Sequence, residues 1–223
     1  MKVLLKNKEL NRYMLLCPGW TFDYKIFPDF NYNIIYYDYL DTENFITAIK
    51  KFLQENEIKN IYLLGWSMGG LVVSKLIEYL NVKIEKIFLI SVVKNFNGEM
   101  LKKTEALLNS NFSKAIDKFY RNIFIGDSAL YSFFKKNYYE YYINRANQKL
   151  VYYELEFLKN NYIDTKKLSE YNVTVIGSKN DIVTPYSEVK KFANEILNSK
   201  FIHSEFTHLP FLYREIYNEI NKG

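Results

Sequence analysis

Cysteine, histidine and long apolar runs are all scarce in this chain of 223 residues. The single cysteine, Cys17, cannot form an internal disulfide, which favours a reducing compartment. Lys6 and Lys8 interrupt the first apolar run, and no later run reaches the length of a membrane span. Basic residues are spread without a block, so the net charge of +5 gives a nucleic-acid role little support. We therefore expect a soluble, cytoplasmic protein.

Strand-like and helix-like patterns alternate along most of the chain. Apolar runs typical of buried strands cover residues 13–17, 33–39, 61–64, 84–92, 172–177 and 200–206. Helical patterns cover residues 42–54, 68–80, 187–197 and 211–221. This alternation predicts an α/β fold in which helices cover both faces of a mostly parallel central sheet.

Residues 94–171 interrupt the alternation with helical, aromatic-rich sequence. We therefore expect a core formed by residues 1–93 and 172–223, with a helical lid inserted between the two parts. Aromatic side chains crowd the insertion, among them Phe133 and Tyr138. These rings either pack the interior of the insertion or line an apolar pocket for a substrate, and the sequence leaves both interpretations open.

Ser67 lies at the centre of the most informative segment. Residues 61–73 have the pattern of a strand, a sharp turn and a helix, and Ser67 occupies the serine position of G-x-S-x-G. Gly65 and Gly69 lack the Cβ atoms that would collide in so tight a turn. The helix N-terminus that follows directs free N–H groups toward a developing oxyanion. The pattern predicts a nucleophilic serine, although a purely structural turn can have the same composition.

The chain has only two histidines, which shortens the search for a general base. His203 lies within the predicted strand 200–206, whereas His208 follows that strand. Reactive groups in open α/β sheets gather beyond the carboxyl ends of the strands. We therefore predict His208 as the base and interpret His203 as a partly exposed strand residue.

An acid must orient the imidazole of His208 and stabilise its charged form. Asp181 follows the predicted strand 172–177, so it also lies beyond a carboxyl end of the sheet. The alternative for Asp181 is an ordinary turn aspartate before a helix. Asp164, which lies in the insertion, is the weaker substitute for the acid.

A tetrahedral intermediate needs two N–H donors near its oxyanion. Met68, the residue after the serine, is predicted to supply one of them. The loop that begins at Pro18 is predicted to supply the other, because Gly19 allows close approach of the backbone and Trp20 follows it. The Trp20 ring either walls an acyl pocket or only packs.

Residues 65–70, 177–185 and 207–211 together resemble the α/β-hydrolase superfamily, in which nucleophile, acid and base follow one another in this chain order. Within that superfamily, Pro18-Gly19-Trp20, Trp66 and the His-x-Pro-Phe segment are most similar to the pimeloyl-[acyl-carrier protein] methyl ester esterases of biotin synthesis, the BioH type. The similarity covers most of the core and weakens across the insertion.

This resemblance implies an enzyme that hydrolyses the methyl ester of a carrier-bound pimeloyl chain and releases methanol. It implies that Ser67 is the nucleophile, that His208 is the base and then the acid, and that Asp181 orients the imidazole. It also implies that the Trp20 and Met68 N–H groups bind the oxyanion. The chemistry needs no metal ion and no organic cofactor.

Basic side chains of the insertion are candidates for contact with an acidic acyl carrier protein: Arg121, Lys135, Lys136, Arg145 and Lys149. The equally simple interpretation is that they are solvated surface residues. We thus predict a serine carboxylesterase acting on an acyl ester. The alternatives are a general short-chain esterase, a thioesterase or a C–C bond hydrolase of the same fold, and a non-catalytic binding protein that keeps the fold.

Overall fold

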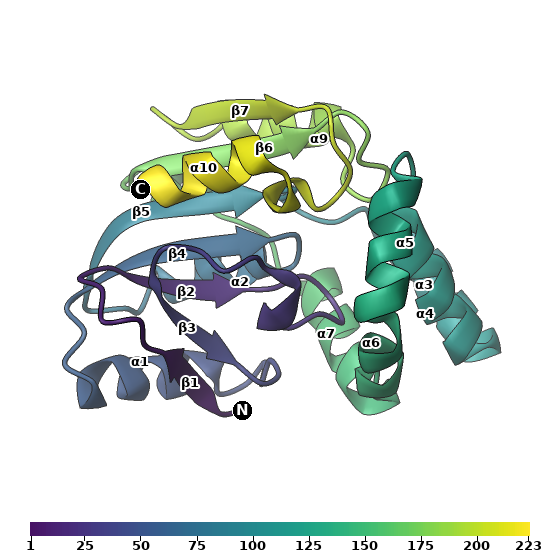
Figure 1. The fold of residues 1–223 in the computed structure, drawn as a ribbon, viewed down its shortest axis with the longest axis horizontal. Coiled ribbons are helices and arrows are strands. Elements are labelled where there is room, and N and C mark those ends of the chain that lie inside the picture. The colour runs from purple at the N-terminus through teal and green to yellow at the C-terminus, as the bar shows by residue number, and fades with distance from the viewer.

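A seven-stranded sheet runs through the centre of the molecule, and the computed structural model describes all 223 residues (Figure 1). The strand order is β1-β3-β2-β4-β5-β6-β7, and every neighbouring pair is parallel except β1 with β3. The strands are β1 (Val3–Lys6), β2 (Tyr13–Cys17), β3 (Asn33–Tyr37), β4 (Asn60–Trp66), β5 (Lys83–Ile90), β6 (Val173–Ser178) and β7 (Lys200–Ser204). The predicted α/β fold with a mostly parallel sheet is therefore confirmed.

Helices cover both faces of this sheet (Figure 1). The far face carries α1 (Phe45–Glu55), α2 (Gly69–Leu76) and α9 (Tyr186–Asn194), and the near face carries α10 (Arg214–Lys222). Two short 3-10 helices, η1 (Tyr24–Ile26) and η2 (Pro210–Leu212), lie in loops. Helix α1 is amphipathic and buries Phe45, Ile49 and Leu53, which share one face at a spacing of four residues. Almost every residue of α2 is buried, because this helix lies against the central strands.

Several element boundaries differ from the sequence expectation, and one strand was not expected. Strand β1 was not expected, because its three apolar residues give too short a signal. It forms by antiparallel pairing with β3. Helix α2 ends at Leu76, near the point where the Tyr171 hydroxyl donates to the Ile77 carbonyl. Strand β5 ends at Ile90, because the next residue, Ser91, has a φ of 52° and leaves the extended conformation.

Six helices connect β5 to β6, and we call residues 94–171 the insertion. They are α3 (Gly98–Ser110), α4 (Phe112–Ile123), α5 (Ser128–Asn137), α6 (Tyr139–Arg145), α7 (Gln148–Asn160) and α8 (Thr165–Leu168). Side-chain oxygens of Asn97, Asn111 and Asn147 cap the starts of α3, α4 and α7. Helices α3 to α7 lie beyond the end of the sheet toward which the parallel strands point (Figure 1). No helix in the structure has the length and apolar composition needed to span a bilayer.

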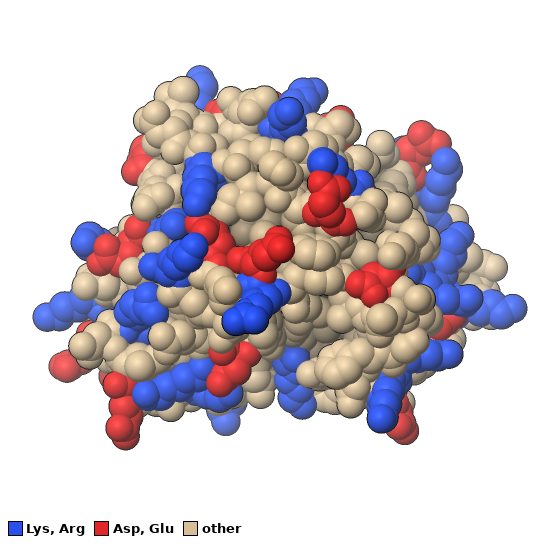
Figure 2. Space-filling view, turned by 45° about the horizontal axis from the view of Figure 1, so that its top comes forward, with Lys and Arg blue, Asp and Glu red and all other residues tan.

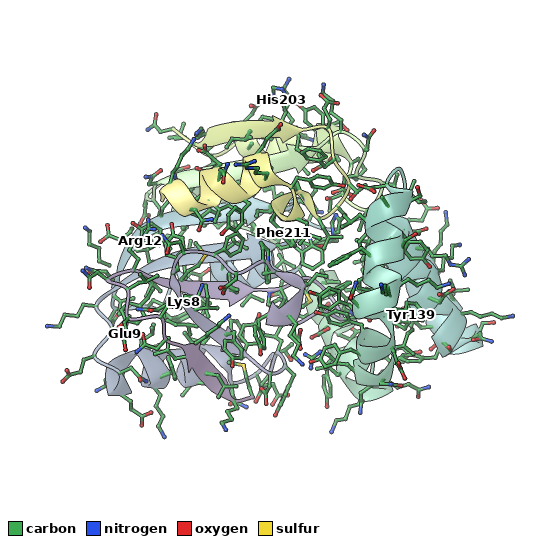
Figure 3. All side chains as sticks on the ribbon, viewed as in Figure 1. Lys8, Glu9, Arg12, Tyr139, His203 and Phe211 are labelled. Atoms are coloured by element: carbon green, nitrogen blue, oxygen red, sulfur yellow. The ribbon has the colours of Figure 1, made fainter.

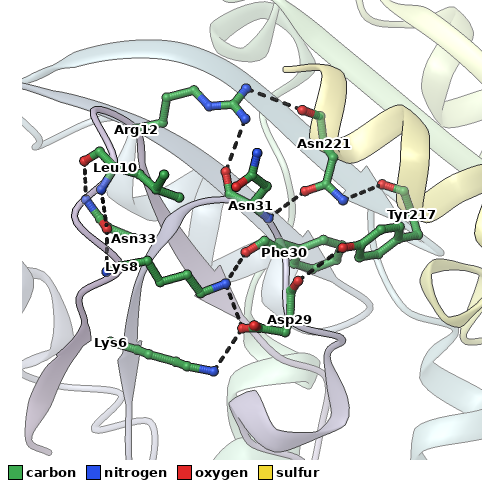
Figure 4. A network of polar contacts seen from close by, with 10 residues as sticks. All are labelled: Lys6, Lys8, Leu10, Arg12, Asp29, Phe30, Asn31, Asn33, Tyr217 and Asn221. Carbon is green, nitrogen blue, oxygen red and sulfur yellow. Dashed lines mark hydrogen bonds and ion pairs between the residues drawn. The ribbon is translucent and has the colours of Figure 1, made fainter.

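A polar network joins the N-terminal strands to α10 (Figure 4). Asp29 forms ion pairs with Lys6 at 2.8 Å and with Lys8 at 2.7 Å. The Asn31 N–H donates to the side chain of Asn221 in α10 at 2.7 Å. These contacts lie at the opposite end of the sheet from the insertion, so they support the fold without facing the site.

Candidate active site

Ser67 follows β4 in a strained turn that the surrounding backbone holds in place. Its φ is 53°, in the left-handed region that residues with a Cβ rarely adopt, and its N–H donates to the Ile90 carbonyl at 2.9 Å. A Cβ on Gly69 would lie 1.8 Å from the Cys17 carbonyl oxygen, and one on Gly65 would lie 2.7 Å from the Gly69 oxygen. The turn is therefore possible only because both positions lack a side chain.

His208 lies in the loop after β7, and its imidazole is almost completely buried. The Trp66 indole N–H donates to the His208 carbonyl at 2.8 Å, and the two rings are 5.4 Å apart between centroids. These contacts place the imidazole beside the residue that precedes Ser67. Its Nδ1 lies 2.7 Å from Asp181 Oδ2, whereas its Nε2 is buried without a hydrogen-bond partner.

Asp181 lies in the turn after β6 and is fixed by its own neighbours in sequence. One carboxylate oxygen accepts from the N–H groups of Val183 and Thr184, and the other accepts from the Thr184 hydroxyl at 2.7 Å. Burial raises the pKa of the Asp181 carboxyl, but His208 and the hydrogen bonds outweigh burial and hold this pKa below its usual value. An ionised carboxylate only accepts hydrogen bonds, so Nδ1 of His208 carries the proton.

The residues that sequence reasoning ranked lower lie elsewhere. His203 is exposed on β7, an edge strand separated from β4 by β5 and β6, and it lies at the outer edge of the sheet (Figure 3). Asp164 caps α8 by accepting from the Lys166 N–H at 2.9 Å. Cys17 is buried in β2, and burial raises the pKa of its thiol, which keeps the sulfur protonated.

The loop of residues 18–23 follows β2, and we call it the β2 loop. A Cβ on Gly19 would lie 3.3 Å from the Ser67 Cβ, so the β2 loop runs directly against the serine turn. The N–H groups of Trp20 and Met68 donate no hydrogen bond within the chain. Two N–H donors without acceptors therefore lie in segments that adjoin the serine, one from each segment that the sequence indicated.

The Trp20 ring faces the insertion. Its indole N–H donates to the Val151 carbonyl of α7 at 3.0 Å, and its ring lies 4.7 Å from the Phe119 ring between centroids. The next residue, Thr21, donates its N–H to the buried carboxyl of Glu154, also on α7, at 3.0 Å. Sequence reasoning missed Glu154. Its signal was a lone carboxyl on the apolar face of the predicted helix, where the same helix buries Val151 and Leu158.

A cavity of about 630 Å³ lies between the insertion and the loop that carries Asp181. Its walls come from α3, α4 and the β6–α9 loop, and they include Phe119, which contacts Trp20, and Thr184, which contacts Asp181. The wall is partly apolar, while Lys103 and Lys118 are among its polar members. Neither Ser67 nor His208 lines this cavity, and both side chains are buried in this structure.

The four insertion residues predicted to bind substrate do not come together. Phe133 is 53% exposed on α5 and contacts Tyr138, and neither ring lines the cavity. Arg121 pairs with Asp117 within α4. Arg145 turns inward and donates to the Asp38 carbonyl, so it is not a free surface cation.

Other Lys and Arg side chains gather over the insertion at the right-hand end of Figure 2. Lys135, Lys136 and Lys149 of the insertion are exposed. No group of three or more His, Cys, Asp or Glu side chains is arranged to hold a metal ion.

A family model described as the alpha/beta hydrolase fold matches residues 18–214. This chain belongs to that family. The match spans the β2 loop, the serine turn, the insertion and the loops that carry Asp181 and His208. A search of curated proteins found no match to the sequence.

Several solved structures share the fold of this α/β-hydrolase. A putative non-heme bromoperoxidase from Mycobacterium tuberculosis has a TM-score of 0.76 at 14% identity, covering 100% of this chain and 93% of that one. An esterase from Exiguobacterium antarcticum has a TM-score of 0.73 at 15% identity, covering 99% and 92%. An enol-lactonase from Burkholderia xenovorans has a TM-score of 0.77 at 13% identity, covering 99% and 94%. At these identities the likeness establishes the fold, and the chemistry must be inferred from the site.

Proposed function

We propose that this protein is a serine esterase that hydrolyses carboxylic esters. One observation carries the proposal. Nδ1 of His208 lies 2.7 Å from the Asp181 carboxylate, while Nε2 is buried, unpartnered and held beside the serine turn. An imidazole held in this tautomer by a buried carboxylate is suited to remove a proton from a neighbouring hydroxyl.

The proposed reaction has two steps. Ser67 Oγ attacks the ester carbonyl as its proton passes to His208 Nε2, and the C–O bond to the alcohol then breaks as His208 returns that proton to the leaving oxygen. Water next attacks the acyl-enzyme with the same base, which frees the acid and restores the Ser67 hydroxyl. Asp181 stays ionised throughout and stabilises the imidazolium.

The developing oxyanion requires donors that are already in position. The unpartnered N–H groups of Trp20 and Met68 support this role, because each lies beside the serine turn and neither is used by the fold. We also propose that the insertion acts as a lid over residues 1–93 and 172–223. Ser67 is only 6% exposed beneath it, so a substrate reaches the hydroxyl when the insertion moves.

The test is the Ser67→Ala variant assayed with p-nitrophenyl acetate. We expect a burst of p-nitrophenolate from the wild-type protein and no turnover above background from the variant, with equal thermal unfolding temperatures. The exposed Ser128, at the start of α5, supplies the matched control Ser128→Ala. Hydrolysis that persists in Ser67→Ala would remove this serine from the mechanism.

The narrower proposal is that the substrate is the methyl ester of a pimeloyl chain on acyl carrier protein. The sequence resemblance supports it, as do the exposed Lys135 and Lys136, which offer an acidic carrier a positive surface. The test is growth of a biotin auxotroph that lacks its own methyl ester esterase. Growth is expected. Its absence, together with a preference for acyl thioesters or short esters in a substrate panel, would contradict this choice of substrate.

A further inference from the structure

Glu154 is a buried carboxyl that the proposed reaction does not use. It lies on α7, facing the β2 loop, and one of its oxygens accepts the Thr21 N–H at 3.0 Å. Burial raises the pKa of Glu154 to about 7, although the Thr21 N–H and Arg145 both act to lower it. A carboxyl in an apolar interior destabilises the fold unless its contacts compensate, so its contact with the β2 loop is the feature to explain.

Thr21, the residue that Glu154 holds, has a strained backbone. Its φ is 68°, in the left-handed region where a β-branched residue is a genuine outlier. The Phe22 N–H donates to the Gly19 carbonyl at 3.1 Å, so the chain turns tightly around Trp20 and Thr21. Such a conformation persists only where the surrounding structure determines it. Because the Trp20 N–H lies on this turn, the direction of that N–H depends on how firmly Thr21 is held.

The insertion also supplies other hydrogen bonds that hold the β2 loop. Val151, three residues before Glu154 on α7, accepts the Trp20 indole N–H at 3.0 Å. The buried Asp23 carboxylate accepts the hydroxyl groups of Tyr141 and Tyr142 on α6. Of these contacts, only that of Glu154 reaches the backbone of the strained residue, and it binds the N–H next to that of Trp20.

We propose that Glu154 is a positioning residue, which fixes the β2 loop from the insertion and thereby aims the Trp20 N–H at the substrate oxygen. Its kinetic consequence rests on the proposed function, whereas the fixing of the loop is measurable without any substrate. Met68 differs in this respect, because it lies in the serine turn itself, whose backbone packs against β2 and β5.

The surroundings of Glu154 allow charge and hydrogen bonding to be separated. Three titratable groups lie near the Glu154 carboxyl: Tyr37 of β3, Tyr120 of α4 and Arg145 of α6. A fourth, Cys17 of β2, lies beside Tyr37. Burial raises the pKa values of the thiol and both phenols, so the Arg145 guanidinium is the only cation among them. Glu154→Gln keeps an oxygen acceptor and removes the charge, whereas Glu154→Met keeps the length and removes both.

The experiment measures kcat and KM for p-nitrophenyl acetate, and amide hydrogen exchange of a peptide covering residues 18–24. We expect Glu154→Met to lower kcat about 10- to 100-fold with little change in KM, because an oxyanion donor is misaligned rather than the substrate lost. Exchange of the peptide should become faster. The unfolding temperature of the Glu154→Met protein should not fall, since an apolar side chain replaces a buried carboxyl. The Glu154→Gln protein should keep the kcat of the wild type and its slow exchange of this peptide.

Glu156 provides the matched control, because it is exposed on the same helix and pairs with Lys159. Glu156→Met should change neither kcat nor exchange. Unchanged exchange in Glu154→Met would overturn the proposal, and so would faster exchange with unchanged kcat. If the wild-type protein hydrolyses no ester, the proposed function fails, and the exchange result alone decides whether Glu154 fixes the loop. Glu154→Leu is the second apolar variant should Glu154→Met not fold.

Discussion

The serine turn and the β2 loop face each other across the site, yet they are held in different ways. Backbone packing holds the serine turn: the Ser67 N–H bonds to β5, and Gly69 lies against the Cys17 carbonyl of β2. Hydrogen bonds to the insertion hold the β2 loop, through residues more than one hundred positions later in the chain. The serine turn is therefore built by the core, and the β2 loop is shaped by the insertion.

This difference assigns separate tasks to the two parts of the chain. The core fixes the turn of Ser67, the proposed nucleophile, and it also fixes the Asp181 turn, whose contacts lie within three residues apart from that with His208. The insertion helps to fix Trp20, one of the two proposed oxyanion donors. Substitutions of the core residues at the site are expected to abolish hydrolysis. Substitutions of the residues that join the insertion to the β2 loop are expected to reduce kcat only partly.

The largest effect on activity is expected from a substitution of Asp181. Asp181→Asn should lower kcat by about 10³- to 10⁴-fold, because an amide stabilises the wrong tautomer of His208 and leaves its charged form uncompensated. Asp164→Asn is the control, because asparagine caps α8 as well as aspartate does and retains activity. Steady-state kinetics with p-nitrophenyl acetate measure both. Loss of activity in Asp164→Asn alone would place the acid in the insertion and reverse the assignment.

The next effect tests the backbone packing of the serine turn. Gly69→Ala should destabilise the protein by about 3 kcal/mol and displace Ser67, because the new Cβ would meet the Cys17 carbonyl at 1.8 Å. Gly98→Ala is the matched control, since nothing lies within 4 Å of the added Cβ. Its stability should change by no more than about 0.5 kcal/mol. Equal unfolding curves for the two variants in urea would show that the turn tolerates a side chain.

The same difference explains how much the sequence could predict. The G-x-S-x-G motif predicted Ser67, and the strand pattern with the sheet-end rule predicted Asp181 and His208, whose side chains lie 2.7 Å apart in the structure. Residues of the same motif segments hold these side chains in place: Trp66 contacts His208, and Thr184 contacts Asp181. Glycine and serine at fixed spacing encode a tight turn, which then packs against β2 and β5.

The contacts of the insertion were not predictable in this way. A surface role for Arg145 was a reasonable expectation from charge alone, but its guanidinium lies inward and bonds to the Asp38 carbonyl. Glu154 and Tyr142 meet the β2 loop because α7 and α6 pack against it, far from it in sequence. The packing of those helices depends on aromatic contacts, such as that of Phe134 with Tyr142, which no local pattern specifies.

Glu154, the buried carboxyl of the insertion, should make the free energy of unfolding depend on pH to a moderate extent. The folded pKa of Glu154 is about 7 against an ordinary value of 4.5, so its contribution to stability is complete below pH 4.5 and is lost as the pH rises through 7. The loss amounts to about 3 kcal/mol. The Asp181 carboxyl makes the stability depend on pH only in more acidic solution, because its pKa in the folded protein lies below the ordinary value of 3.8.

Urea unfolding of the wild type and of Glu154→Gln as a function of pH isolates this contribution. The difference in unfolding free energy between the two proteins should decline from pH 4.5 to above pH 7 and then level off. A difference that stays constant over this range would mean that the carboxyl ionises normally in the folded protein.

The smallest effect concerns the side-chain anchor of the β2 loop. Trp20→Phe keeps an aromatic ring beside Phe119 but removes the donor to the Val151 carbonyl, which should cost about 1 to 2 kcal/mol of stability. Because Glu154 still holds Thr21, the loop keeps its course and kcat should fall by no more than about 10-fold. Combining Trp20→Phe with Glu154→Met removes both anchors on α7, and the loss of activity should then exceed the product of the single losses. Strictly multiplicative losses would mean that the two anchors act on the loop independently, so that the insertion does not hold it as one unit.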